Sequence, residues 1–126
     1  MKTYAKQKNW REIQSFLPAE FQLRPGQEPQ EEWWPWGPHH IHLDCYRNEA
    51  APLKVILFHG LGTNGRQMSS ILGAPLGHRG FEMIAIDMPE YGLTQLGRGK
   101  PVRYDDWVQA GSDLVNAELA KDSRPI

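Results

Sequence analysis

Two short runs of mostly apolar residues, at positions 53–58 and 81–87, constrain the fold of this chain more than any other feature of its sequence. Continuous apolar runs with β-branched and aromatic residues are typical of strands that are covered on both faces of a parallel sheet. Between the runs, Met68, Ile71 and Leu72 recur at helical spacing, so we expect them on the buried face of a helix. The order strand, helix, strand predicts a right-handed parallel crossover.

Two further segments extend this pattern. Residues 39–46 alternate between apolar side chains and polar ones, which predicts a half-buried strand with a solvent-facing polar side. The apolar members are Ile41, Leu43 and Cys45, and the polar members are His40, His42, Asp44 and Tyr46. Farther along, Asp105 and Asp106 are expected to cap a helix. The apolar face of that helix carries Trp107, Val108, Gly111, Leu114, Val115 and Leu119. The sequence therefore predicts an α/β fold with a mainly parallel sheet and flanking helices.

The first 38 residues have little periodic pattern and contain five of the ten prolines. Trp10, Ile13, Phe16 and Leu17 are spaced for one short helix, which Pro18 would end. A cluster of tryptophans at positions 33, 34 and 36 is expected to form a flap packed onto the protein, and a stacking surface for a ligand is the alternative. We therefore expect a Trp- and Pro-rich extension at 1–38 and the folded core at 39–126.

Length and charge exclude several classes of protein. At 126 residues the chain is shorter than the roughly 150 residues of an average domain, so two independent domains are excluded. Fourteen basic and fifteen acidic residues leave a formal charge of -1, so we expect neither a nucleic acid nor a membrane as partner. The single cysteine, Cys45, and a polar start without a leader-like apolar region predict a cytoplasmic protein. Cys45 itself is expected to be a buried small hydrophobe.

A glycine-rich turn follows the first apolar run. Gly60, Gly62 and Gly65 match the dinucleotide-binding pattern, and Asp87 ends the next strand 22 positions after Gly65. A module that binds a dinucleotide is therefore one hypothesis. A phosphate-binding P-loop is not, because Arg66 stands where that motif requires lysine.

The same turn also fits a different pattern. His59-Gly60 follows the first apolar run, and Asp87, Pro89, Gly92 and Thr94 follow the second in the spacing D-x-P-x-x-G-x-[ST]. In this order and separation, the two segments resemble the α/β-hydrolase family. The resemblance covers about residues 39–126, which correspond to the N-terminal half of that fold.

The resemblance implies a specific chemistry for the turn. In this family the backbone N–H of the residue after His-Gly, here Leu61, donates to the oxyanion of the transition state. Gly60 and Gly62 would let the backbone turn so that this N–H faces the pocket. His59 would support the loop by hydrogen bonds and is not expected to be the catalytic base. Asp87 would fix its turn.

The chain departs from the family at the nucleophile. No G-x-S-x-G elbow occurs in the sequence, and Ser112 of Gly111-Ser112 is expected to be a helix residue. The Ser-His-acid triad would come from residues beyond this chain, as a continuation or a second chain. We therefore expect a hydrolase of small ester-like substrates that needs no cofactor and no metal. This chain alone would be inactive.

Two alternatives remain open beside this prediction. One is a non-catalytic protein that keeps the hydrolase fold as a scaffold. The other concerns His40, His42 and Asp44, which would share one face of a strand and could ligate a metal ion. A polar, solvent-facing side of an outer strand explains the same alternation equally well.

Overall fold

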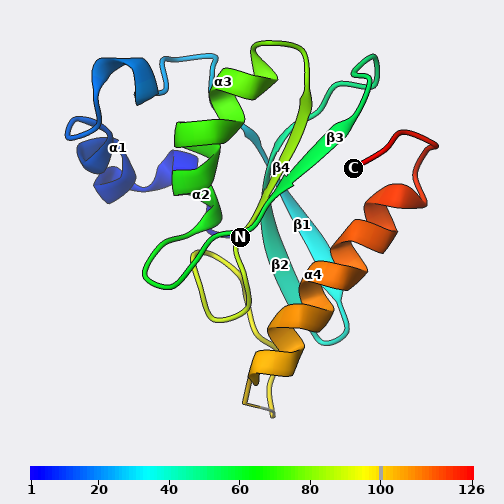
Figure 1. Ribbon diagram of the computed structural model, residues 1–126. Coiled ribbons are helices and arrows are strands. Elements are labelled where there is room, and N and C mark those ends of the chain that lie inside the picture. Colours follow the sequence, from blue (N-terminus) through cyan, green and yellow to red (C-terminus); the bar gives the residue numbers. More distant parts are fainter. Residues whose placement is uncertain (100) are drawn as a thin grey trace.

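The computed structural model describes residues 1–99 and 101–126, and places a four-stranded sheet between two layers of helices (Figure 1). Short helices come first along the chain: the 3-10 helix η1 (Tyr4–Lys6), α1 (Lys8–Gln14) and the 3-10 helix η2 (Ala19–Phe21). The rest comprises β1 (Gln30–Trp36), β2 (His39–Tyr46), β3 (Lys54–Leu57), α2 (Gly65–Met68), the π-helical turn η3 (Ser69–Gly73), α3 (Ala74–Gly77), β4 (Glu82–Ile86) and α4 (Tyr104–Leu119).

The strands lie in the order β1-β2-β4-β3. β3 and β4 are parallel, with Val55 opposite Met83, and the helical segment between them makes the expected crossover. β2 is antiparallel to both β1 and β4. The predicted α/β fold is confirmed, but parallel pairing in the described sheet is confined to β3 and β4. The reason is that β1 and β2 form a hairpin, in which Gly37 supplies the positive φ of a two-residue turn.

Strand β1 lies inside the segment predicted to be an extension. It pairs with β2 from Gln30 to Trp36, so a boundary at residue 38 falls within a hairpin. This strand was not predicted because Pro35 interrupts its sequence pattern. Proline is tolerated here because β1 is at an edge of the sheet, where a residue can lack a hydrogen-bonded N–H. The short helix expected in the segment is present as α1. The tryptophans of β1 pack onto the protein, with Trp34 and Trp36 against the core.

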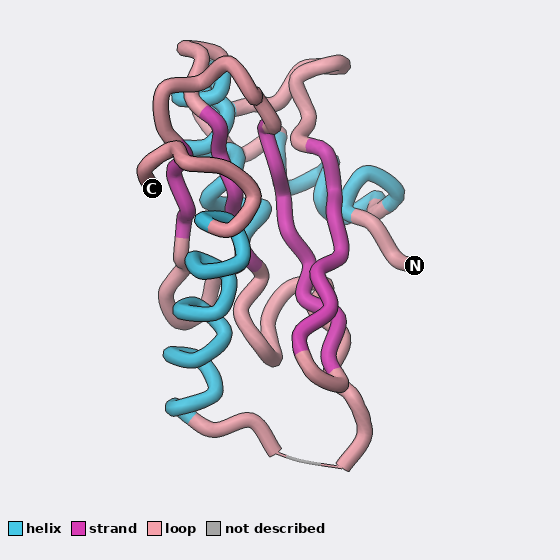
Figure 2. The backbone as a smooth tube through the Cα atoms, turned by 90° about the vertical axis from the view of Figure 1, so that its right-hand side faces the viewer, coloured by secondary structure: helices cyan, strands magenta, loops and turns pink. Residues whose placement is uncertain are grey.

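Helix α4 covers one face of the sheet (Figure 2). The core beneath it contains Ile41, Leu43, Cys45, Ile84, Ile86, Met88 and Leu114. The helix begins where the Asp106 carboxylate accepts a hydrogen bond from the Arg103 N–H, at 2.8 Å. Its buried residues are Ala110, Leu114 and Glu118. The predicted apolar face is therefore only partly buried, because Val108 is 57% exposed and Leu119 is 45% exposed.

The opposite face of the sheet is covered by α2, η3, α3 and the N-terminal segment (Figure 1). The helical run changes to a π-helical turn just before Pro75, which has no N–H to donate and whose ring crowds the preceding turn. Ile71 and Leu72, predicted to be buried, are 41% and 42% exposed. Small residues face the sheet instead, because Ser69, Gly73 and Ala74 allow a close approach.

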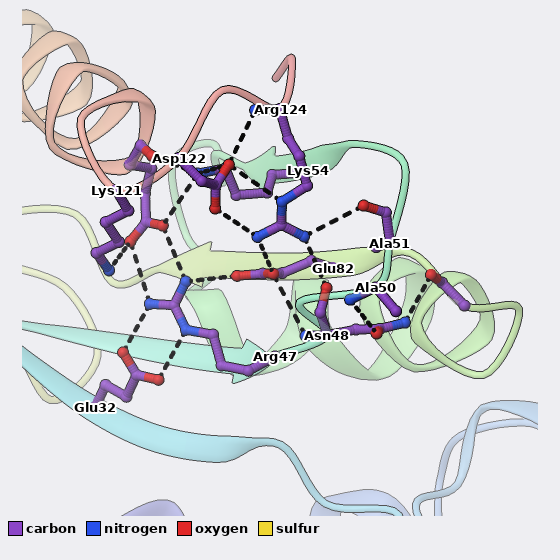
Figure 3. Close-up of polar contacts among 12 residues, drawn as sticks. Glu32, Arg47, Asn48, Ala50, Ala51, Lys54, Glu82, Lys121, Asp122 and Arg124 are labelled. Atoms are coloured by element: carbon purple, nitrogen blue, oxygen red, sulfur yellow. Dashed lines mark hydrogen bonds and ion pairs between the residues drawn. The ribbon is translucent and has the colours of Figure 1, made fainter.

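A cluster of charged side chains joins the elements at the amino ends of β3 and β4 (Figure 3). Arg47 lies at its centre and donates to Glu32, Glu82 and Glu118, each at 2.9 Å or less. Arg124 reaches Glu82 from the segment after α4. This cluster ties β1, β2, β4 and α4 together at the end of the sheet opposite the loops described next.

Candidate functional site

The loop between β3 and α2 lies at the carboxyl end of the parallel strands, where α/β folds bind their ligands. His59 is buried within it, with 5% of its surface exposed. Its Nε2 accepts a hydrogen bond from the Met88 N–H at 3.0 Å, and its Nδ1 lies 2.8 Å from the Gly60 carbonyl oxygen. Together the two bonds place the proton on Nδ1. The imidazole therefore links the loop to the segment after β4.

Leu61 and Gly62 form the tip of this loop. The Leu61 side chain is 84% exposed, and Gly62 has a φ of 75°, which favours glycine. Within the described part of the chain, the Leu61 N–H meets no hydrogen-bond acceptor. A hollow of about 410 Å³ adjoins the tip. Its lining is mainly apolar and aromatic, and comprises Gly60, Leu61, Glu90, Tyr91, Val102, Arg103, Tyr104 and Trp107.

Aromatic rings form the wall between this hollow and the sheet. The rings of Tyr91 and Trp107 meet edge to face, with centroids 5.1 Å apart, and the His59 ring lies 5.2 Å from Tyr91. The Trp107 Nε1–H donates to the Pro89 carbonyl oxygen at 3.0 Å. These contacts hold α4 against the two loops that flank the hollow.

The segment from Asp87 to Thr94 closes on itself by hydrogen bonds. The Asp87 carboxylate accepts from the Leu93 N–H at 2.8 Å, and the Thr94 hydroxyl donates to the Asp87 carbonyl oxygen at 2.5 Å. Gly92 has a φ of 55°, and a Cβ at this position would overlap the Asp87 carboxylate. The D-x-P-x-x-G-x-[ST] pattern therefore describes one tight turn around a buried acid.

Asp87 also holds the start of α2. Its Oδ1 accepts from the Gly65 N–H at 2.7 Å, and its side chain is completely buried. In a dinucleotide site the helix N-terminus would face a pyrophosphate, and the acid would bind a ribose hydroxyl. Neither group is accessible, because the Gly65 N–H and Asp87 bind each other. The dinucleotide-binding hypothesis is therefore wrong for this turn.

A layer of buried charged side chains lies under the N-terminal segment. Arg66 forms a bidentate ion pair with Asp44, and Glu31 Oε1 lies 2.8 Å from His42 Nε2. His42 Nδ1 lies 3.0 Å from Asp87 Oδ2, although not in line for a regular hydrogen bond. The expectation that this side of β2 faces solvent is wrong for His42 and Asp44, because Tyr4 and Trp10 fold back over them, and Arg66 supplies the compensating charge.

The pKa values of His42 and Glu31 favour their charged forms, whereas burial raises the pKa of Asp44. Burial opposes protonation of His42, but the contacts with Asp87 and Glu31 outweigh it and raise the pKa of His42 to about 9. Burial likewise opposes ionisation of Glu31, but hydrogen bonds from His42 and from the Tyr4 and Ala5 amides lower the pKa of Glu31 to about 2. His42 is therefore a buried imidazolium between carboxylates at neutral pH.

The predicted metal alternative does not fit these residues. His40 is exposed, and its backbone pairs with Gln95 instead. The structure brings Glu31, His42 and Asp44 together, with ligand atoms within 4.8 Å of one another. Arg66 already occupies Asp44 with two hydrogen bonds, so a cation there would meet a guanidinium group at close range.

Two other residues singled out in the sequence lie in ordinary surroundings. Ser112 lies within α4, as expected for a helix residue. Cys45 is 1% exposed, and burial raises the pKa of its thiol. None of the helices in the described part of the chain combines the length and apolar character needed to cross a membrane.

Comparison with known proteins supports the fold. No protein-family model and no curated protein matches this chain. A solved structure of a "putative lipase (lip1) from Acinetobacter baumannii AYE" matches 82% of the chain, with a TM-score of 0.65 and 16% identity. A "putative epoxide hydrolase from Klebsiella pneumoniae" matches 70% of it, with a TM-score of 0.60 and 20% identity.

Both neighbours have folds of the α/β-hydrolase type, so the sheet and helices of this chain form part of such a fold. The matches cover 36% of the first neighbour and 30% of the second. The chain therefore spans about a third of the length of the structures it matches. At these identities the similarity establishes the fold alone.

Proposed function

We propose that this chain is the N-terminal portion of an α/β-hydrolase that cleaves an ester or a similar acyl bond in a small substrate. The main support for this proposal is that the Leu61 N–H has no hydrogen-bond acceptor in the described chain and lies in a loop beside an apolar hollow. In acyl transfer, preorganised N–H groups stabilise the negative charge that develops on the carbonyl oxygen.

Each residue of the loop has a distinct part in this proposal. Leu61 donates its backbone N–H to the oxyanion. His59 holds the loop through its bonds to Met88 and Gly60, and Gly62 supplies the left-handed backbone at the tip. Gly60 borders the hollow without a side chain. The nucleophile, the base and the acid come from residues beyond this chain, and no cofactor or metal takes part.

The remainder of the fold, as a continuation or a second chain, would complete the sheet beside β3. β3 is one of the two edge strands of the described sheet, and Phe58 just after it is 43% exposed. A second apolar hollow of about 420 Å³ lies between Phe58 and α4, on the side that carries the exposed Val108. The solved neighbours are about three times as long as the part that matches, which supports a missing remainder. We also propose a cytoplasmic location, which the single cysteine supports.

The test of the oxyanion donor compares two variants of the complete protein. Leu61→Pro removes the N–H, whereas Leu61→Ala keeps it and removes only an exposed side chain. With a p-nitrophenyl ester as substrate, we expect Leu61→Pro to lower kcat by about 10²- to 10³-fold. Leu61→Ala should stay within a few fold of wild type. An unchanged kcat in a folded Leu61→Pro protein would contradict the proposal.

A second measurement separates an enzyme from a non-catalytic scaffold. A fluorophosphonate probe labels activated serines, so it should label the complete protein and leave the 126-residue polypeptide unlabelled. A complete protein that neither reacts with the probe nor hydrolyses esters would instead be a scaffold with a hydrolase fold.

A further inference from the structure

Tyr4 is buried although it precedes the sheet by a long segment. It is 5% exposed, and its hydroxyl donates to Asp87 Oδ2 at 2.9 Å. Its backbone N–H donates to Glu31 Oε1 at 2.7 Å, which ties η1 to the start of β1. The Arg66 guanidinium lies over its ring, 4.9 Å from the centroid. The N-terminal segment is therefore docked onto the charged layer through specific polar contacts.

The Asp87 carboxylate that Tyr4 binds fastens one end of the Leu61 loop, and the backbone after Asp87 fastens the other. Asp87 Oδ1 accepts from Gly65, where the loop enters α2, and the next residue, Met88, donates to His59 at the loop's beginning. Gly65 approaches β4 so closely that a Cβ would lie 2.7 Å from the Ile86 carbonyl oxygen. The position of the loop's Gly65 end relative to the sheet therefore depends on the orientation of the Asp87 carboxylate.

The orientation of that carboxylate is set by the groups around its other oxygen, Oδ2. Asp87 is fully buried, so its oxygens must be satisfied by protein donors. Oδ2 accepts from the Tyr4 hydroxyl and the Leu93 N–H, and His42 lies 3.0 Å away. Tyr4 is the one of these three that comes from the N-terminal segment.

We propose that Tyr4 is a positioning residue of the hydrolytic site: by orienting Asp87, it sets the place of the loop that carries the Leu61 N–H. This inference rests on the proposed function, which assigns the Leu61 N–H its role. An oxyanion donor must lie about 2.7–3.1 Å from the developing charge, and a misplacement of about 1 Å can cost about 10²-fold in rate. The N-terminal segment is then part of the site's scaffold.

The first test follows the loop itself, without any substrate. Tyr4→Phe removes one hydroxyl from the folded protein, and Tyr46→Phe is its matched control. Tyr46 also binds the N-terminal segment, through the Gln27 carbonyl oxygen at 2.7 Å, but Asp87 is not among its partners. Hydrogen–deuterium exchange in peptides spanning residues 59–66 should accelerate by about tenfold in Tyr4→Phe, since a hydrogen bond to a charged group is lost. It should stay unchanged in Tyr46→Phe.

The second test uses ester hydrolysis by the complete protein. Tyr4 is not among the residues that line the hollow, so Tyr4→Phe should lower kcat by about tenfold and leave KM unchanged, whereas Tyr46→Phe should alter neither. Wild-type exchange in Tyr4→Phe, or equal effects of both variants, would overturn the positioning role. If the wild-type protein hydrolyses no ester, the proposed function fails, and the exchange measurement still decides whether Tyr4 positions the loop.

Discussion

Arg66 and Asp44 form a bidentate ion pair inside the protein. Arg66 Nε lies 2.5 Å and Nη2 lies 2.8 Å from the two carboxylate oxygens, and the side chains are 1% and 0% exposed. Asp44 belongs to β2 and Arg66 to α2, so the pair joins the sheet to the helix that follows the Leu61 loop. Because water is excluded, each charge depends on the other.

Arg66→Met should therefore reduce the free energy of unfolding by about 3–5 kcal/mol, because it leaves the buried Asp44 carboxylate without its hydrogen-bonded partner and with only His42, at 3.9 Å, nearby. Urea denaturation measures this change. Replacing both residues, as Arg66→Met with Asp44→Leu, should recover part of the loss. Lys8→Met is the control, since the Lys8–Glu12 pair is exposed and should contribute less than about 1 kcal/mol. A double variant no more stable than Arg66→Met would contradict this account.

Gly92→Ala should destabilise the protein more than Gly37→Ala does. The two glycines have nearly equal φ angles, 55° and 54°, so both alanines bear the same backbone strain. At Gly37 an added Cβ would meet no atom within 4 Å, whereas at Gly92 it would overlap the Asp87 carboxylate. The difference between the two midpoints of urea denaturation reports that overlap. Equal midpoints for the two variants would show that the Asp87 turn accommodates the added methyl group without loss of stability.

His42 should make stability depend on pH in the alkaline range. Its folded pKa of about 9 lies above its ordinary value of 6.5, so its contribution is full below pH 6.5 and is lost as pH rises through 9. The titratable groups facing it are Glu31, Asp44, Asp87 and Tyr4, with Arg66 beyond Asp44. His42→Gln should therefore cost more stability at pH 6 than at pH 10 in urea denaturation. An equal cost at both pH values would exclude a buried imidazolium.

Arg47→Met should destabilise the protein at pH 7 and less at pH 4. Burial opposes ionisation of Glu82 and Glu118, but hydrogen bonds from Arg47 outweigh it and lower the pKa of both. A carboxylate whose pKa is lowered in the folded protein stabilises the fold at pH values above its ordinary pKa of 4.5. This stabilisation is lost as the pH falls below 4.5 toward the folded pKa. Urea denaturation of wild type and variant at pH 7 and pH 4 measures the two losses in the free energy of unfolding. Lys121→Met, which removes a half-exposed partner of the same Glu118, should have a smaller effect.

Most of the regular structure was predictable from local patterns. The alternation at 39–46 and the apolar runs at 53–58 and 81–87 correspond to β2, β3 and β4. The helix expected to be capped by Asp105 and Asp106 is α4, which begins at Tyr104 and holds both acids in its first turn. These elements follow from side-chain periodicity, which is a property of neighbouring residues.

Strand β1 and the burial of His42 could not be predicted in this way. Pro35 breaks the pattern of β1, and only pairing with β2 makes the segment a strand. His42 and Asp44 were predicted to face solvent because the residues around them alternate between polar and apolar, as in a strand with one solvent-exposed face. The signal that could have revealed their burial was Arg66, a basic residue at the start of a helix that packs on the same face of the sheet.

By itself, the sequence determined the order of α1, β2, β3, β4 and α4, the glycines that the turns require, and the two segments that resemble a hydrolase. Only the tertiary structure decided which charges are buried, because that depends on a fold-back of the N-terminal segment over residues about 40 to 80 positions away. It also decided that Asp87 binds Gly65 and Tyr4 rather than a ligand. The physical reason is that burial of a charge is stable only when its partners converge from distant parts of the chain.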